Sequence, residues 1–324
     1  MIIDFFETDC FVTTLCNHFS LDELFFRDVL HSIDQVHESA IDIVKKMRIN
    51  LCANTDELEI HCRHITTSND KLSSIKAYGM LTLDQVLCQN TPLNTFLSKY
   101  NISINASKQE FTINNQSFHI NGYYEPCTPC ARGKTSESFS ARSVPFYDCC
   151  DFHQKMALLN TKLYHDKSEV EVYVAGSDEE MLLHYTSILD GPEILLTIGD
   201  IISTLSKKID PDYLQLAWSK QKDMKRYILE FNIPLNAIET NTDYKHYREY
   251  CDNSEWYEYY GFDYTDYEND RVPLEFYRNK MLIEFCFHSF FFPDNNCYCQ
   301  VLPCFHISPE MISVLREIDI NSDP

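Results

Sequence analysis

Four residues near position 64 have side chains that could bind and orient a small polar ligand. The stretch "RHITT" places Arg63, His64, Thr66 and Thr67 within five positions. Their guanidinium, imidazole and hydroxyl groups form hydrogen bonds, and an imidazole can also exchange a proton near neutral pH. The sequence leaves two interpretations of His64 open: a group that takes part in chemistry, or a hydrogen-bonded structural histidine at the edge of a sheet.

A second set of residues has the spacing of a zinc site. Cys127 and Cys130 form a C-x-x-C pair, and after nineteen intervening residues Cys150 and His153 form a C-x-x-H pair. Two such pairs are typical of tetrahedral zinc, and four protein ligands predict a structural site because a catalytic zinc keeps one position open. Cys149 competes with Cys150 as a ligand. The alternative is that two of the fourteen cysteines fall into this pattern by chance.

A strand is expected to position the residues around His64. In "LEIHCRHI" apolar and polar residues alternate, which is typical of a strand with one buried face. His64 shares the predicted inward face with Ile60 and Cys62. It is therefore expected to face either a core or a cleft.

The segment after this strand predicts a short helix that ends at a glycine. Ser68 or Asn69 can cap the helix, and Leu72 and Ile75 lie about one turn apart within it. Gly79 can adopt the left-handed conformation that commonly ends a helix. The chain is thus expected to run from a strand through a short helix to "ML".

This order of elements resembles the beginning of the ADP-ribosyltransferase superfamily, in the His-Tyr-Glu branch of diphtheria-type toxins and poly-ADP-ribose polymerases. The similar residues are Arg63 to Thr67 and Ile75 to Met80, and Ile65 stands where that family commonly has glycine. The resemblance implies an enzyme that consumes NAD. It also implies that His64 hydrogen-bonds the ribose next to the nicotinamide.

The same resemblance implies further contacts with NAD. Arg63, Thr66 and Thr67 would help His64 to hold the cofactor, and Tyr124, in "INGYYEP", would join them.

The chemistry that this family performs requires an aromatic residue and a carboxylate. Cleavage of the nicotinamide glycosidic bond develops positive charge on the ribose, which a carboxylate can stabilise while an aromatic ring stacks on the nicotinamide. The resemblance suggests Tyr123 or Tyr124 for the aromatic residue. Glu284 is the candidate carboxylate because it lies inside the apolar stretch "MLIEFCFH", which predicts a late strand. Glu193 is a rival, and Gln300 occupies the last predicted strand, where the family often has its glutamate.

Periodicity along the rest of the chain predicts an α+β fold with a mixed or antiparallel sheet. We expect an N-terminal helical region over residues 1–50, in which Ser20 and Glu23 form a capping box, and an α+β domain over residues 51–324. Further expected elements are helices at 41–47 and 194–205, a hairpin at Asn114-Asn115, strands at 225–235, 279–292 and 297–307, a Cys-rich insertion at 122–155 and an acidic, Tyr-rich excursion at 240–270.

Composition restricts the possible partners. The 49 Asp and Glu residues against 27 Lys and Arg residues give a net charge of −22, so duplex nucleic acid is a poor partner and a protein is a better acceptor. Seven glycines and no glycine-rich phosphate loop argue against dinucleotide dehydrogenases and P-loop enzymes. No secretion signal and no apolar run of about 20 residues is present, which predicts a cytoplasmic protein without a membrane span.

Two functions follow as expectations. The first is an ADP-ribosyltransferase-like enzyme that transfers ADP-ribose from NAD to a protein or other macromolecule, or hydrolyses NAD. Small transferases of this kind resemble toxins or phage-defence effectors. The second is a non-enzymatic protein that binds a basic partner through the acidic, Tyr-rich segment 240–270.

Overall fold

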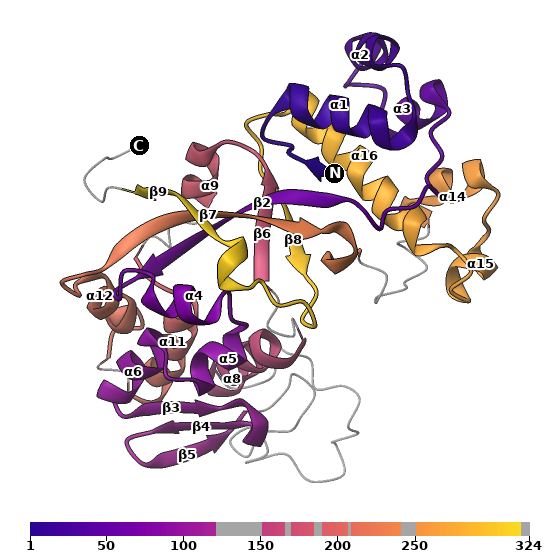
Figure 1. Cartoon of the computed structure of the whole chain (residues 1–324). Helices are drawn as coiled ribbons and strands as arrows, with labels where there is room; N and C mark the ends of the chain where they lie inside the picture. Colours follow the sequence, from indigo (N-terminus) through magenta and orange to yellow (C-terminus); the bar gives the residue numbers. More distant parts are fainter. Residues whose placement is uncertain (121–150, 166–169, 185–189, 207–208, 241–250, 319–324) are drawn as a thin grey trace, which may run out of the picture. The chain divides into compact units, whose positions relative to one another are not determined.

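The computed structural model describes residues 1–120, 151–165, 170–184, 190–206, 209–240 and 251–318. The fold is α+β, as the sequence predicts, with antiparallel strand pairs and many helices (Figure 1). The chain divides into two compact units that are each discontinuous in sequence. Unit 1 comprises Met1–His64, Glu171–His184 and Glu230–Phe305, and unit 2 comprises Ile65–Val170, Tyr185–Leu229 and His306–Pro324.

The first fifty residues form helices, as predicted, and these belong to unit 1. They are α1 (Thr8–Phe19), α2 (Glu23–Ser32) and α3 (Ala40–Met47). The predicted capping box of Ser20 and Glu23 is wrong. Ser20 instead ends α1 in the left-handed conformation, and the Asp22 carboxylate caps α2 by accepting a hydrogen bond from the Phe25 amide at 2.8 Å.

Strands β1 (Ile2–Ile3), β2 (Glu59–Ser68), β6 (Val170–Ala175), β7 (Lys225–Pro234), β8 (Cys297–Val301) and β9 (Ser313–Ile318) form the larger sheet in the described part of the chain. The order is β8-β6-β2-β7-β9, and β1 pairs with β2 in parallel. β2 and β6 are antiparallel, with Arg63 opposite Tyr173. The predicted strands at 225–235 and 297–307 therefore exist, the second in a shorter form.

The inward alternation predicted for β2 holds only in its first half. Ile60 and Cys62 are buried, but the next buried residues are Ile65 and Ser68, three positions apart. His64 is consequently half-buried and does not continue the buried face.

The predicted strand at 279–292 is wrong, because these residues lie in α16 (Leu274–Phe291) of unit 1. Its buried residues recur at helical spacing, as Phe276, Asn279, Ile283 and Cys286 show. Large apolar residues also occupy the other faces of this helix, so a short apolar window does not distinguish it from a buried strand.

The acidic, Tyr-rich segment is helical where it is described, in α14 (Ser254–Tyr260) and α15 (Tyr264–Glu268). Tyr257 and Tyr267 are buried, with ring centroids 5.4 Å apart, and Tyr257 also stacks on Phe276 of α16 at 5.6 Å. These two tyrosines of the segment thus form part of the core of unit 1. Unit 1 also contains α9 (Asp178–His184) and the 3-10 turn η5 (Leu235–Ala237).

Unit 2 contains a second, three-stranded antiparallel sheet of β3 (Ile102–Asn105), β4 (Glu110–Ile113) and β5 (Gln116–His119). The predicted hairpin is confirmed, since Asn114 and Asn115 both have positive φ between β4 and β5. The helices of unit 2 are α4 (Ser73–Tyr78), α5 (Leu83–Cys88), α6 (Pro92–Lys99), α8 (Asp151–Asn160), α11 (Ile194–Leu205) and α12 (Tyr213–Ser219), with shorter turns η1 (Ala106–Lys108), η4 (Thr161–His165) and η6 (Pro309–Met311).

The apolar stripe predicted at 194–205 builds the core of unit 2. Ile194, Leu195, Ile198, Ile201 and Ile202 of α11 are all buried. They belong to one cluster with residues of α5, α6, α8 and α12, in which Leu214 and Trp218 are the α12 members. This cluster supports the short helices that follow β2.

Gly79 ends α4 where the sequence predicts. Its φ is +74°, and its amide donates a hydrogen bond to the Ile75 carbonyl at 2.8 Å. A Cβ at this position would lie 2.1 Å from the carbonyl oxygen of Ile307. Glycine is therefore required both by the backbone conformation and by the close approach of a neighbouring segment.

Among the helices that the structure describes, none combines the length and the apolar character needed to cross a bilayer.

Candidate functional site

The environment of His64 defines its protonation state. Burial lowers the pKa of the His64 imidazole, and a hydrogen bond with the Glu171 carbonyl offsets part of that effect. Nδ1 lies 2.9 Å from this oxygen, and because a carbonyl can only accept, Nδ1 carries the hydrogen. The ring is therefore neutral at pH 7, and its second nitrogen, Nε2, has a lone pair available to accept a hydrogen bond.

Arg63 has two partners within unit 1. Its Nη1 donates a hydrogen bond to the Asp178 carboxylate at 2.9 Å, and its guanidinium carbon lies 3.9 Å from the centroid of the Phe6 ring. Both members of the ion pair are largely buried. The structure thus gives Arg63 a role in joining β2 to the start of α9 and to the N-terminal segment.

Thr66 and Thr67 follow on β2, in unit 2, and both are half-buried. The hydroxyl that the local structure uses is the next one: Ser68 Oγ accepts a hydrogen bond from the Leu72 amide at 2.9 Å and donates one to Asp70 at 2.7 Å. Asp70 in turn accepts from the Ser74 amide at 2.8 Å. The N-cap of α4 is Leu72, so neither of the predicted capping residues, Ser68 and Asn69, holds that position. The first turn of the helix is instead bonded by Asp70, which the sequence did not single out.

Glu284, the predicted catalytic carboxylate, lies on α16 and not on a strand. Its Oε1 accepts a hydrogen bond from Lys280 Nζ at 2.6 Å, one helical turn away, and its side chain is 42% exposed. A charge at this position needs no buried partner, because solvent and Lys280 both reach it. Within the described residues, no hydrogen bond or ion pair joins it to His64.

The two alternatives to Glu284, which are Glu193 and Gln300, also bond to residues other than His64. Glu193 precedes α11 in unit 2 and forms an ion pair with Lys162 at 2.8 Å. Gln300 lies on β8 in unit 1, where its carbonyl accepts a hydrogen bond from the Glu239 amide at 2.9 Å.

The other predicted site residues fall mostly in the segment 121–150. Tyr123, Tyr124, Cys127, Cys130 and Cys150, together with the alternative ligand Cys149, lie outside the described residues. The fourth predicted ligand, His153, is buried on α8. No group of three metal-ligating side chains occurs among the residues that are described, and zinc binding stays a prediction.

Sequence reasoning missed the partners of Arg63 and His64. Asp178 and Glu171 are 115 and 107 residues away along the chain, and the β2–β6 pairing brings them close. The alternation of "EVEVYVA" predicts a strand, but no local pattern shows which strand it pairs with. Only the register of the sheet places the Glu171 carbonyl at the imidazole.

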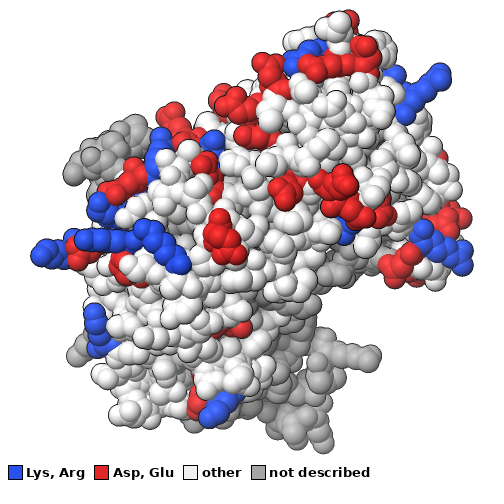
Figure 2. All heavy atoms as spheres, viewed as in Figure 1, with Lys and Arg blue, Asp and Glu red and all other residues white. Residues whose placement is uncertain are grey.

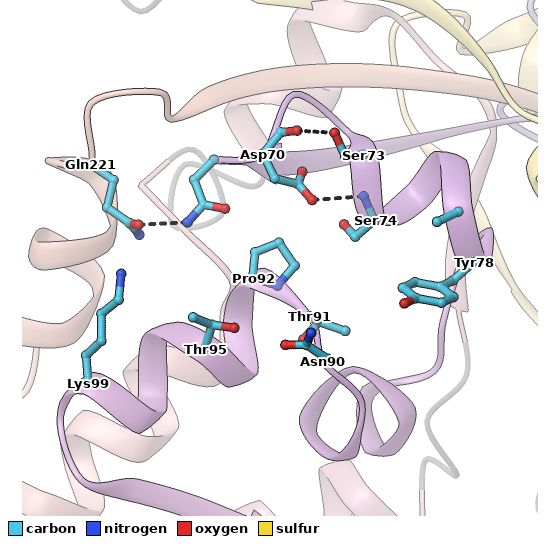
Figure 3. Close-up of a pocket in the computed structure, with 12 residues that line it drawn as sticks. Asp70, Ser73, Ser74, Tyr78, Asn90, Thr91, Pro92, Thr95, Lys99 and Gln221 are labelled. Carbon is cyan, nitrogen blue, oxygen red and sulfur yellow. Dashed lines mark hydrogen bonds between the residues drawn. The ribbon is translucent and has the colours of Figure 1, made fainter.

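A pocket of about 500 Å³ lies within unit 2, close in sequence to β2 (Figure 3). Its walls come from the turn before α4 and α4 itself, from the loop before α6 and α6 itself, and from Gln221. The Asn69 amide donates to the Gln221 side-chain oxygen at 2.7 Å and so closes one side. Most of the lining residues carry a hydroxyl or an amide group, which can bond to a polar ligand.

Charge is distributed unevenly between the units. Unit 1 holds 30 of the 49 Asp and Glu residues and 10 of the 27 Lys and Arg residues, which leaves 19 acids and 17 bases in unit 2. Figure 2 shows acidic side chains gathered over the N-terminal helices, which belong to unit 1. Repulsion of anionic ligands, which the overall charge predicts, is therefore a property of unit 1.

Comparisons of the chain with protein-family models, with curated proteins and with solved structures found no match.

Proposed function

We propose that the chain is an NAD-consuming enzyme of the ADP-ribosyltransferase type. The local order on which the resemblance depends is present: β2 carries His64 and the two threonines, α4 contains Ile75, and Gly79 ends that helix. These elements support the proposal because the family presents its histidine on a strand that is followed by a short helix and glycine.

The observation that carries the proposal is the bonding of His64. A neutral ring with its hydrogen fixed on Nδ1 presents Nε2 as an acceptor for a hydroxyl group. A ribose hydroxyl of NAD is such a donor. The hydrogen bond to Glu171 would hold the ring in one orientation, so that little entropy is lost when the ribose binds.

In the proposed reaction the bond between the nicotinamide nitrogen and the ribose carbon breaks, and nicotinamide leaves with the bonding electrons. A nucleophile of a protein acceptor, or water, then bonds to the same carbon and loses its proton. Positive charge develops on the ribose at the transition state, and a carboxylate lowers its energy. Glu284 remains our candidate because its side chain is 42% exposed and an ion pair between residues one helical turn apart is worth only about 0.5 kcal/mol, so the carboxylate can leave Lys280.

The proposal is tested by measuring nicotinamide release from NAD. We expect His64→Ala to lower the rate by about 100-fold, because a misplaced ribose loses the reacting geometry. His61→Ala is the matched control: His61 lies on the same strand but bonds to Asn232 at 3.0 Å, and its replacement should leave the rate within about twofold. The absence of release by the wild-type chain, with cell extract present as acceptor, would refute the proposal.

The role of the carboxylate needs a separate comparison. Glu284→Gln keeps the size and polarity of the side chain and removes the charge that stabilises the cation. We expect a larger loss of rate than for Glu193→Gln, which breaks an ion pair of similar kind in unit 2. Equal rates in the two variants would remove Glu284 from the proposal and leave His64 to be tested alone.

A further inference from the structure

The pocket of unit 2 is formed by two short helices and the turns that lead into them. Ser74 and Tyr78 lie one turn apart on α4, and Thr95 and Lys99 lie one turn apart on α6. All four residues line the pocket, and Figure 3 shows that α4 and α6 each form part of its wall. The periodicity of each helix therefore presents a row of polar side chains to the same space.

Some of the lining residues are already used by the fold. Asp70 accepts hydrogen bonds from Ser68 Oγ and from the Ser74 amide, and Thr91 Oγ1 donates to the Val86 carbonyl at 2.6 Å and caps α6. These bonds fix the walls of the pocket. The Asp70 carboxylate in particular is committed to the start of α4 and is a poor receptor for a ligand hydroxyl.

Other lining groups are not used in hydrogen bonds of this kind. The hydroxyls of Ser74 and Thr95, the amide of Asn90 and the ammonium of Lys99 form no hydrogen bond or ion pair with any other residue that the structure describes. Three of these groups can both donate and accept, and the fourth is a cation. Together they match a ligand that carries hydroxyls and one anionic group.

The two most distinctive groups lie at opposite ends of the pocket in Figure 3. Tyr78 is 43% exposed and has no ring contact with another residue that the structure describes, and Lys99 provides the charge. Aromatic rings stack on nucleobases by about 1–3 kcal/mol per base, and a lysine ammonium is a common phosphate ligand. The nearly balanced charge of unit 2 does not oppose a phosphate.

We propose that this pocket binds a mononucleotide. The base stacks on Tyr78, the phosphate contacts Lys99, and the ribose hydroxyls bond to the uncommitted groups of Asn90, Ser74 and Thr95. A volume of about 500 Å³ lies within the range of small-molecule sites. The proposal goes beyond NAD turnover and does not depend on it, because it uses none of the residues to which that reaction assigns a role.

The test is calorimetric titration of the full chain with AMP. We expect binding by the wild type and a loss of about tenfold in affinity for Lys99→Met, because a charge-assisted hydrogen bond to the phosphate disappears. Tyr78→Leu, which keeps apolar bulk but removes the ring, should lose a similar factor. Lys76→Met is the matched control, since Lys76 is an exposed lysine of α4 that does not line the pocket, and it should bind AMP as the wild type does.

Three smaller probes separate the parts of the ligand. Adenosine should bind to the wild type as weakly as AMP binds to Lys99→Met, and ribose 5-phosphate should bind as weakly as AMP binds to Tyr78→Leu. Inorganic phosphate alone should bind more weakly than AMP by a larger factor. No AMP binding at millimolar concentration, or equal affinity of Lys99→Met and Lys76→Met with both variants folded by circular dichroism, would overturn the proposal.

Discussion

Unit 1 carries nearly all of the net charge of the chain, whereas unit 2 is close to neutral. The acids exceed the bases by 20 in unit 1, with 30 against 10, and by 2 in unit 2, with 19 against 17. The overall charge of −22 therefore does not describe unit 2, whose surface repels anionic partners much less than that of unit 1.

The units also differ in their buried titratable groups. Burial lowers the pKa of His18, His64 and His288, all in unit 1. Burial also raises the pKa of six thiols in unit 1, which are Cys16, Cys52, Cys62, Cys286, Cys297 and Cys299. The described pocket of unit 2 is instead lined mainly by groups that do not titrate near neutral pH. Proton-dependent chemistry is thus expected of unit 1, and binding through hydroxyl, amide and lysine groups is expected of unit 2.

The largest effect is expected in the core of unit 2. Trp218 is buried on α12 and meets the Phe96 ring edge to face at 5.2 Å. Trp218→Ala should lower the free energy of unfolding by about 3–5 kcal/mol, measured by urea denaturation, because it leaves a large cavity. Leu216→Ala, on the exposed side of the same helix, should cost less than about 0.5 kcal/mol. Equal costs would show that the apolar cluster does not hold unit 2 together.

In unit 1 a polar residue is expected to have the next largest effect. Asn279 is fully buried on α16, donates to the Leu51 and Ala53 carbonyls at 2.8 Å each, and accepts from His18 Nε2 at 2.8 Å. Asn279→Ala should cost about 2–3 kcal/mol in urea denaturation, because it leaves these groups without a partner.

The control for Asn279 is Asn269→Ala, at an exposed position in the same unit, which should change the free energy of unfolding by less than about 1 kcal/mol. If Asn279→Ala lowers the free energy of unfolding by as little as Asn269→Ala does, buried polar contacts do not hold α16 in place. Both units would then depend on apolar packing alone.

The ion pair of Arg63 is expected to have a smaller effect. A double-mutant cycle with Arg63→Met and Asp178→Asn should give a coupling free energy of about 1 kcal/mol, because both side chains are largely but not fully buried. The coupling should fall little when salt is added, in contrast to that of the more exposed pair Lys225–Glu317 in unit 2. A coupling free energy of zero would show that Asp178 does not hold Arg63, which could then bind a ligand.

The pH dependence of stability is expected to be the smallest of these effects. Because the pKa of His18, His64 and His288 is lowered in the folded state, the unfolded state binds more protons just below the ordinary value of 6.5. The histidine contribution to the free energy of unfolding should therefore be constant above about pH 7.5, and the free energy of unfolding should fall as the pH decreases through 6.5. The His64→Gln variant should show a shallower fall than the wild type in urea denaturation. An equal fall would assign the effect to other groups.

Local signals predicted much of the fold, and long-range pairing explains what they missed. The hairpin at Asn114-Asn115 and the stripe of α11 are specified by neighbouring residues, so the sequence predicts them correctly. The strand prediction around Glu284 is wrong because α16 carries apolar residues on several faces. In the candidate site, the position of His64 on a strand was predictable.

The partner of His64 was not predictable. The Glu171 carbonyl is a backbone group 107 residues away, and its place depends on the pairing of β2 with β6. The two units likewise combine distant segments, so the contrast in their charge is visible only once the fold assigns each residue to a unit.

The central claim is that His64 is neutral, with its hydrogen on Nδ1 and a lone pair on Nε2 that accepts a hydrogen bond from NAD. Nitrogen-15 NMR of the imidazole measures this directly. At about pH 7 we expect Nδ1 to resonate as a protonated nitrogen and Nε2 as an unprotonated one, and we expect the Nε2 resonance to shift when NAD is added. A protonated Nε2, or an Nε2 resonance that does not move at saturating NAD, would contradict the account.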